Sequence, residues 1–451
     1  MPKFSKIYNT KVDVLIIDRL LSDYIISCIP KSATISIADN PSRGFIPYIN
    51  SLSFFLKVVR NMLRFGLSYK AKVLFASIID ELEPEVIITF IDNNYVLGVL
   101  SKIYPKKKMI SVQNGVRFNS FSSIGRSVDG YIFGDYYTFG LFEKDLYLSL
   151  GGVYSNHYAV GSLKLGIFLS TYNNYMLQKN HSAKTICFIS EYRKQMQSST
   201  SLLDQEFFNA SKRLYELTVL FALKNDYKVV VLMKNQKNDK DYKKELYYFK
   251  EISNSKNIQL CDNNVKEMSS YQNAMQSNII IGMDSTLLIE MYGCKKKVIW
   301  GAAFDMEFSR GRGGIAYKEK MPKEVILDSI SPKELNQKIT NLLDIDEDEY
   351  LRLTSSSRHY FMNINNDMGF PHEIIKNNID KFLSTNSWMV SKDIIFINSV
   401  DDLGSYSSDV LNASINIALC HRAQHKLNRM NIPYENSLTY LKKKDSANIL
   451  A

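Results

Sequence analysis

The chain has 451 residues, of which 45% are hydrophobic and 23% charged, and its formal net charge is +10. This length predicts two or three domains, and the spread-out basic residues, without a nucleic-acid motif, favour a phosphate-bearing substrate on an anionic membrane surface over DNA or RNA. Five scattered Cys and six His, with no CxxC or HExxH motif, argue against a disulfide framework and a tightly bound metal.

The apolar content of the sequence also bears on location. The first ten residues are polar, unlike a signal peptide, and no apolar run reaches the roughly 18–20 residues that cross a bilayer. We therefore expect a cytoplasmic protein that can associate peripherally with the inner membrane.

The first half alternates short apolar runs with amphipathic segments, the longest of which spans about Ile49–Leu82. Such alternation predicts a parallel, doubly wound sheet. The expected strands are Val12–Ile17, Ala33–Ala38, Val86–Ile91, Met109–Val112, Tyr131–Phe133 and Tyr158–Val160.

The pattern breaks around Gly161–Ala183, where a polar stretch predicts a linker, and the alternation then resumes. The expected strands of the second half are Thr185–Ser190, Lys228–Met233, Ile258–Cys261, Asn278–Gly282 and Lys297–Gly301. Its expected helices are Leu203–Lys224, Lys240–Ser253, Val265–Met275, Thr286–Tyr292, Pro332–Asp344 and Glu347–Phe361.

These patterns predict an α/β protein with two Rossmann-like doubly wound domains that face a cleft, the arrangement called GT-B in glycosyltransferases. The predicted domains are residues 1–163 for an acceptor and residues 184–385 for an activated donor. Residues 392–451 form either a helical tail, with a long helix at Ser408–Met430, or the start of a further domain.

The segment TFIDNNY, Thr89 to Tyr95, ends a predicted buried strand and places Asp92, Asn93 and Asn94 at its carboxyl end. A carboxylate that faces the cleft there can act as the general base that deprotonates an acceptor hydroxyl, which typically contributes ~10²–10⁴-fold. Capping of the following helix is an equally good explanation of these residues.

The next strand ends in SVQNGVR, Ser111 to Arg117. Gln113 and Asn114 offer amide groups suited to sugar hydroxyls, and Arg117 can face a phosphate or carboxylate. An Asn-Gly turn without a chemical role remains the alternative.

In the second half, the run from Asn278 to Gly301 contains a strand, a turn and a helix. Asp284, Ser285 and Thr286 open the helix, whose free N–H groups form an anion site. Glu290 lies four residues after Thr286 on the same face, where its carboxylate can accept from two ribose hydroxyls. A capped helix with a surface Glu is the simpler interpretation, and we favour the nucleotide site.

Four more residues are candidates for holding the donor. Arg193 and Lys234 follow the first two strands of the second half, and Arg310 lies in the Arg- and Gly-rich loop Phe308–Gly314. His372 begins a helix. Taken alone, Arg193 and Lys234 are better explained as solvated surface charges, and His372 as a helix-start residue without a chemical role.

The segment Leu52–Arg64 combines apolar residues with Lys57, Arg60 and Arg64 on one helical face. Cations near an anionic leaflet favour membrane contact by about 1 kcal/mol each. An amphipathic helix packed on its own sheet is the more ordinary explanation, and it is the one we prefer from sequence.

TFIDNNY, SVQNGVR and DSTLLIEMYGCKKKVIW, in this order, resemble a family of bacterial surface-carbohydrate biosynthesis proteins of lipopolysaccharide O-antigen and capsule loci. The resemblance covers about Val12 to Phe382. It implies a GT-B transferase with an N-terminal acceptor half and a C-terminal donor half. The chain is also similar to transferases that use CMP-activated Kdo or nonulosonic acids, although their His-Pro pair is reversed here as Pro371-His372.

The leading hypothesis is therefore a metal-independent glycosyltransferase that moves a sugar from a CMP- or NDP-sugar to a lipid-linked or oligosaccharide acceptor. Helix N–H groups and cations would stabilise the leaving phosphate, and other polysaccharide-assembly enzymes are expected partners. The alternatives are a CDP-polyol phosphotransferase, a sugar-nucleotide epimerase and a non-catalytic glycan- or nucleotide-sugar-binding protein.

Overall fold

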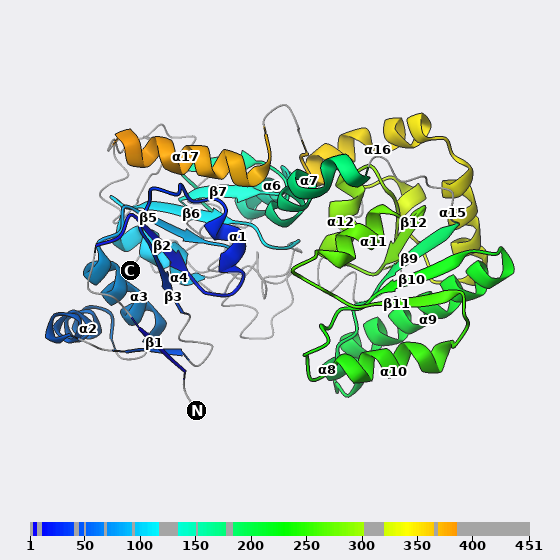
Figure 1. The fold of residues 1–451 in the computed structure, drawn as a ribbon, viewed down its shortest axis with the longest axis horizontal. Helices are drawn as coiled ribbons and strands as arrows, with labels where there is room; N and C mark the ends of the chain where they lie inside the picture. Colours follow the sequence, from blue (N-terminus) through cyan, green and yellow to red (C-terminus); the bar gives the residue numbers. More distant parts are fainter. Residues whose placement is uncertain are drawn as a thin grey trace, which may run out of the picture.

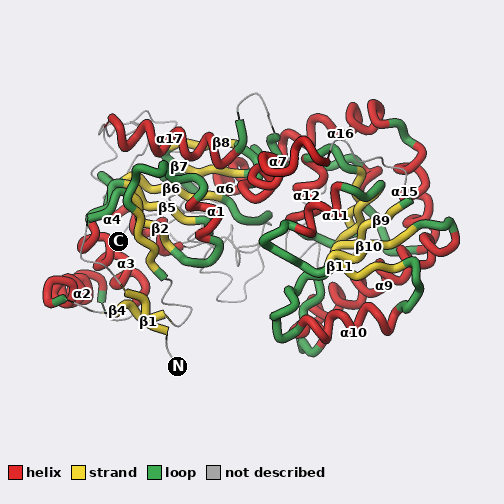
Figure 2. The backbone as a smooth tube through the Cα atoms, in the orientation of Figure 1, coloured by secondary structure: helices red, strands yellow, loops and turns green. Residues whose placement is uncertain are grey.

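The computed structural model describes residues 3–6, 11–39, 45–48, 51–66, 70–92, 95–116, 134–149, 152–176, 184–301, 320–364 and 369–385. Figure 1 shows two halves side by side, the N-terminal half in blue and cyan and the C-terminal half in green and yellow. Each half has a sheet flanked by helices (Figure 2). The predicted α/β fold with two Rossmann-like halves is confirmed.

The N-terminal half is built on six parallel strands in the order β3-β2-β5-β6-β7-β8. Their bounds are β2 Val14–Ile17, β3 Ile35–Ala38, β5 Val86–Thr89, β6 Lys108–Val112, β7 Asp135–Thr138 and β8 Asn156–Ala159. The central strands β2 and β5 are fully buried, as expected for a parallel sheet with helices on both faces. A separate parallel pair joins β1 (Lys3–Lys6) to β4 (Phe45–Tyr48).

Six described helices accompany the N-terminal sheet in the sequence. They are α1 Ser22–Ile26, α2 Leu52–Phe65, α3 Lys70–Leu82, α4 Tyr95–Ile103, α6 Phe142–Ser149 and α7 Leu163–Met176. The predicted amphipathic segment at Ile49–Leu82 is thus two helices, α2 and α3, which pack against each other.

The C-terminal half has five parallel strands in the order β11-β10-β9-β12-β13. Their bounds are β9 Thr185–Ile189, β10 Lys228–Leu232, β11 Ile258–Cys261, β12 Ile279–Gly282 and β13 Lys297–Trp300. Each of these strands lies within one residue at either end of its predicted range, because short buried apolar runs bounded by polar turns leave little choice of register.

The helices of the second half are α8 Lys194–Gln197, α9 Leu202–Lys224, α10 Tyr242–Ile252, α11 Ser269–Met275, α12 Thr286–Gly293, α15 Pro332–Asp344, α16 Glu347–Phe361 and α17 Pro371–Thr385, with a short 3-10 turn η2 at Lys323–Val325. Of the six predicted helices, five begin within two residues of the predicted start, and the one predicted from Val265 begins at Ser269. Ser331 and Asp346 cap α15 and α16 by accepting from the backbone N–H groups of Glu334 and Glu349.

The predicted linker at Gly161–Ala183 is wrong over most of its described length, because residues Leu163–Met176 form helix α7. Leu163, Leu165 and Phe168 are buried in the surrounding cores. Tertiary packing of these three apolar residues outweighs the polar sequence that suggested a linker.

Helix α17 follows the second half in sequence but packs on the first. Ile375 and Ile379 are buried in the core that contains β2 and β5, and α17 lies in orange along the N-terminal half in Figure 1. The predicted donor domain, residues 184–385, therefore includes a helix that covers the sheet of the N-terminal half. A Cβ at Gly166 of α7 would lie 2.4 Å from Cδ of Pro371, so the close approach of α7 and α17 requires glycine there.

Some predictions fall outside the described residues. The predicted strand Tyr131–Phe133 and the whole tail, residues 392–451, belong to this group. The strand β7 starts two residues after that predicted strand and is itself fully buried. Among the described residues, none of the helices is both long and apolar enough to cross a bilayer.

Candidate functional site

The two sheets approach each other through the loops that follow their strands. The strand order switches direction between β2 and β5 in one sheet and between β9 and β12 in the other, and ligands of such sheets bind at the carboxyl ends near this point. The backbone N–H of Val116, after β6, donates to Oγ1 of Thr286, the first residue of α12, at 3.3 Å. The structure thus brings the two predicted loop regions together.

Asp92 lies at the predicted place after β5, but its side chain points into the protein. It is 2% exposed, and Oδ2 accepts from the hydroxyls of Tyr136 (3.1 Å) and Tyr147 (3.3 Å). Its Oδ1 accepts from the backbone N–H of Asn114 at 3.4 Å. The expectation that Asp92 is presented to solvent in the cleft is therefore wrong in this conformation, since tyrosines from β7 and α6 close over it.

Gln113 is buried in the same way. Its Nε2 donates to Oε1 of Glu143 at 2.6 Å and to the carbonyl of Gly115 at 3.0 Å, while its Oε1 accepts from the backbone N–H of Phe139 at 2.7 Å. These bonds use both ends of the amide, so the prediction that Gln113 is open to a sugar acceptor is wrong here. Asn114 is half-buried.

Three predicted acceptor residues, Asn93, Asn94 and Arg117, lie outside the described residues.

The start of α12 is more accessible. Asp284, Ser285 and Thr286 are all half-buried, and Oγ of Ser285 caps the helix by accepting from the backbone N–H of Leu287 at 3.3 Å. The backbone N–H of Asp284 donates to Oε1 of Glu191, which follows β9, at 2.7 Å. This bond spans the switch point of the C-terminal sheet and joins the two loops that would enclose a donor.

Glu290 is buried, 2% exposed, and its two carboxylate oxygens are already occupied by hydroxyl donors. Ser162, which precedes α7, donates to Oε1, and Tyr271 of α11 donates to Oε2 at 2.8 Å. Burial raises the pKa of this carboxyl, opposed by the Ser162 hydrogen bond and by the charge of Lys164. The alternative interpretation of Glu290 as a surface residue is therefore wrong, and in this structure its carboxylate accepts from two protein hydroxyls.

Lys234 and Arg193 form the cationic part of the same edge. Both side chains reach solvent. Desolvation by the surrounding protein and, to a lesser degree, repulsion from Arg193 together lower the pKa of Lys234 to about 8, against the attraction of Glu191 and Glu245. Burial also raises the pKa of Glu191.

A buried carboxylate, Glu245 of α10, holds the loops that carry these charges. It accepts from the backbone N–H groups of Lys234 and Asn235, both at 2.8 Å, and from the hydroxyl of Ser190. The loops after β9 and β10 are therefore fixed relative to each other. This pre-organises the side chains that follow those strands.

The last two donor candidates are not part of this edge as described. Arg310 lies outside the described residues. His372 is half-buried near the start of α17, where its ring stacks on Phe370 with centroids 5.9 Å apart. Burial lowers the pKa of His372, which disfavours its charged form.

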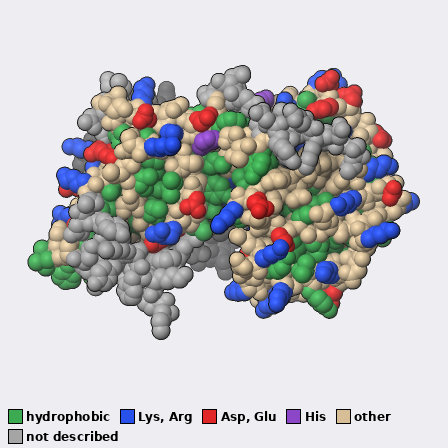
Figure 3. Space-filling view, viewed as in Figure 1, with side chains coloured by type: hydrophobic (Ala, Val, Ile, Leu, Met, Phe, Trp, Pro, Cys, Tyr) green, Lys and Arg blue, Asp and Glu red, His purple; other side chains and the backbone are tan. Residues whose placement is uncertain are grey.

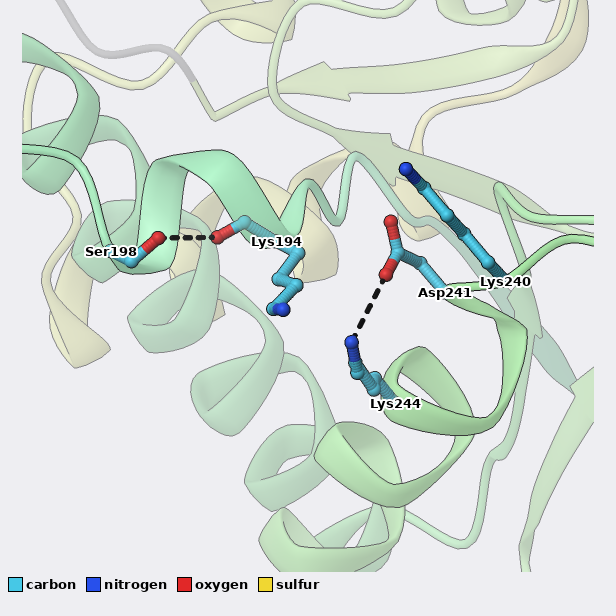
Figure 4. Close-up of a pocket in the computed structure, with 5 residues that line it drawn as sticks. All are labelled: Lys194, Ser198, Lys240, Asp241 and Lys244. Carbon is cyan, nitrogen blue, oxygen red and sulfur yellow. Dashed lines mark hydrogen bonds and ion pairs between the residues drawn. The ribbon is translucent and has the colours of Figure 1, made fainter. Parts of the chain in front are cut away.

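A hollow of about 290 Å³ lies between the start of α8 and the start of α10 (Figure 4). Lys194, Lys240 and Lys244 line it together with Ser198 and Asp241. Lys244 contacts Asp241 at 3.4 Å, which leaves an excess of positive charge in the hollow. It lies beside the loops after β9 and β10, on the same half as Lys234.

No group of three or more His, Cys, Asp or Glu in the described part of the chain has the arrangement of a metal site.

Several site residues could not be singled out from the sequence. Glu191 and Glu245 are two, because only the fold shows which acidic residues reach the strand ends. Ser162 and Tyr271 are two more, since they come from segments far from Glu290 in sequence. The sequence did offer a signal for Glu191, because it follows the first strand of the second half and lies two residues before the candidate Arg193.

Comparisons with known proteins agree with this architecture. S. aureus MnaA, solved with UDP, has a TM-score of 0.50 at 13% identity, covering 86% of this chain and 97% of that one. A variant of the wall teichoic acid polymerase TagF gives a TM-score of 0.50 at 12% identity, with 84% and 91% covered. The chain thus has the GT-B-type fold.

Residues 110–305 match a family described as "putative O-antigen biosynthesis protein". This match confirms the predicted resemblance to surface-carbohydrate biosynthesis proteins over that segment. It includes Gln113, Asn114 and the whole start of α12, but not Asp92. The curated proteins contain no match to the chain.

Proposed function

We propose that the chain is a metal-independent glycosyltransferase of surface polysaccharide synthesis. It transfers a sugar from a nucleotide-activated donor to a lipid-linked or oligosaccharide acceptor, in the cytoplasm and peripherally at the inner membrane. The observation that carries the proposal is the edge of the C-terminal sheet at which its strands end. There the start of α12 and the cations Arg193 and Lys234 lie around the switch point between β9 and β12.

The donor half fits a nucleotide diphosphate or monophosphate. Backbone N–H groups at a helix start favour anions, and two neighbouring cations add to that preference. These groups also stabilise the negative charge that develops on a leaving phosphate. S. aureus MnaA, which shares the fold, was solved with UDP, and this supports a nucleotide as the ligand.

Glu290 is proposed to bind the ribose by exchanging partners. In this structure its two oxygens accept from hydroxyls of Ser162 and Tyr271. A ribose offers two hydroxyls of the same chemistry, so a small movement of the α7 segment away from α12 would free at least Oε1. The carboxylate would stay paired throughout, which avoids the cost of a buried unpartnered charge.

Asp92 is proposed to act on the acceptor side mainly by positioning. It holds the backbone of Asn114, and two residues later Val116 donates to Thr286 of the donor half. A role as general base requires that Tyr136 and Tyr147 first release its Oδ2. The sequence-based assignment of Asp92 as the catalytic base therefore remains a proposal for a rearranged state.

The proposal is tested by product analysis with a panel of UDP-, GDP-, CDP- and CMP-linked sugars, each with and without a lipid-linked acceptor. We expect release of free nucleotide only when acceptor is present, with a new glycosidic product. Conversion of a donor sugar to its epimer without acceptor would indicate an epimerase. Transfer of an alcohol phosphate from a CDP-polyol would indicate a phosphotransferase, and donor binding without turnover a binding protein.

A further inference from the structure

Helix α2 presents a continuous apolar stripe to solvent. Leu52, Phe55, Leu56, Val59 and Leu63 are 74%, 48%, 57%, 36% and 85% exposed. Their spacing of three or four residues places them on one face of the helix. Figure 3 shows hydrophobic side chains gathered at the end of the molecule where α2 lies.

The stripe is not needed to attach α2 to the fold. The opposite face supplies Phe54, Val58 and Asn61, which are buried, and this face packs on α3. Asn61 also donates to Oδ2 of Asp80 on α3 at 2.8 Å. Helix α2 therefore has two apolar faces, one packed against its own half and one exposed to solvent. Packing within the fold explains the first face and leaves the second unexplained.

Cations border the stripe along one side. At about 100° per residue, Arg60, Lys57 and Arg64 fall on the sector next to Leu52, Leu56 and Leu63. Lys57 and Arg60 pair with Glu81 and Asp80 of α3, whose side chains are only 5% and 15% exposed.

Glu81 and Asp80 therefore lie beneath Lys57 and Arg60, so the charged groups nearest to solvent on this side of α2 are positive. Arg64, at the end of the sector, is exposed and lies over the ring of Phe65 at 5.0 Å.

We propose that α2 is a docking helix that lies in the surface of an anionic phospholipid bilayer. An exposed apolar face next to a cationic border is the pattern of helices that bind in the plane of the lipid headgroups. Apolar side chains enter the acyl boundary, and the cations meet lipid phosphates. The chain's net charge of +10 acts in the same direction.

A second copy of the chain fits the stripe less well. The stripe lies on a single helix of 14 residues, about 21 Å long, whereas a standard stable interface takes about 800 Å² from each partner. A bilayer needs no such area on a partner surface, because each buried apolar group contributes independently.

The placement of α2 is compatible with work at a membrane. It lies at the outer end of the N-terminal half, away from the C-terminal half (Figure 1). Docking through α2 leaves the α12 edge accessible from solution. The inference does not rest on the proposed reaction, and its test uses no nucleotide or glycan.

The test is co-sedimentation of the full chain with vesicles of phosphatidylcholine, with or without phosphatidylglycerol. We expect binding to the mixed vesicles and a loss of affinity of about tenfold or more for the double variant Phe55→Glu with Leu63→Glu. The matched control is Leu202→Glu with Leu220→Glu on α9, which changes two leucines of similar exposure in the other half and should leave binding intact.

A second arm tests the charge. Arg64→Gln should weaken binding to the phosphatidylglycerol vesicles several-fold and leave weak binding to phosphatidylcholine unchanged. The melting temperature of each variant shows that the fold persists. Unchanged vesicle binding by the stripe variant would overturn the proposal. So would a wild-type dimer that the stripe variant converts to a monomer, because the stripe would then bind a second copy.

Discussion

Both halves are built on a parallel sheet, with a different strand order in each, and they differ at the edge that should face a ligand. In the N-terminal half, Asp92 and Gln113 are 2% and 1% exposed and are fully engaged with protein groups. In the C-terminal half, Ser285, Thr286 and Lys234 reach solvent at the corresponding edge. The polar residues after the strands are thus buried in the N-terminal half, which we call the closed edge, and accessible in the C-terminal half, which we call the open edge.

This difference separates two tasks. The open edge is pre-organised by Glu245 and by the cap of α12, so it can bind an anion without rearrangement. The closed edge keeps its carboxylate satisfied by tyrosines until something displaces them. We therefore expect phosphate binding at the α12 start to be robust to changes at Asp92 and Gln113, and acceptor chemistry to be sensitive to them.

The largest expected effect breaks the closed edge. Asp92→Ala leaves the buried hydroxyls of Tyr136 and Tyr147 without this acceptor and should lower the free energy of unfolding by about 2–4 kcal/mol. Urea denaturation followed by circular dichroism measures this. Asp92→Asn keeps an acceptor oxygen and should cost clearly less. Equal stability of the alanine variant and wild type would mean that Asp92 is not held as described.

The next effect removes charge from the open edge. Lys234→Met should weaken nucleotide-sugar affinity about tenfold, because one cation next to a phosphate is removed from a partly desolvated site. Calorimetric titration gives the affinity. Lys228→Met, at the opposite end of the same strand, is the matched control and should bind as wild type does. Equal losses in both variants would point to a general charge effect.

A smaller effect comes from the helix cap. Ser285→Ala should lower the free energy of unfolding by about 1 kcal/mol and should also weaken the binding of the nucleotide-sugar donor. Ser331→Ala removes the cap of α15 at a similar cost in stability and should leave donor affinity unchanged. If both variants lose stability and neither loses affinity, the start of α12 has only a structural role.

The smallest effect is a pH dependence. The pKa of Lys234 is about 8, so its ammonium is mostly charged below pH 7 and mostly neutral above pH 9. Donor affinity should therefore fall as pH rises through about 8. Lys234→Arg, which stays charged, should keep its affinity to higher pH. A profile that is identical in both proteins would exclude Lys234 from the donor site.

The sequence predicted the strands and helices of the second half well, since each buried run is bounded by clear polar turns. It failed at α7, whose polar sequence hides three residues buried by distant helices. The positions of Asp92 and Glu290 along the chain were predicted, but their exposure was not. Tyr136, Tyr147, Ser162 and Tyr271 determine that exposure, and all four come from separate segments that only the fold brings together.

Hydrogen–deuterium exchange with and without a nucleotide sugar tests the difference between the halves most directly. The account predicts slower exchange at the amides of Lys234–Asn235 and of residues 284–288 when donor is added, with residues 113–116 changed little. Protection confined to the N-terminal strand ends, or none at all with every nucleotide offered, would contradict it.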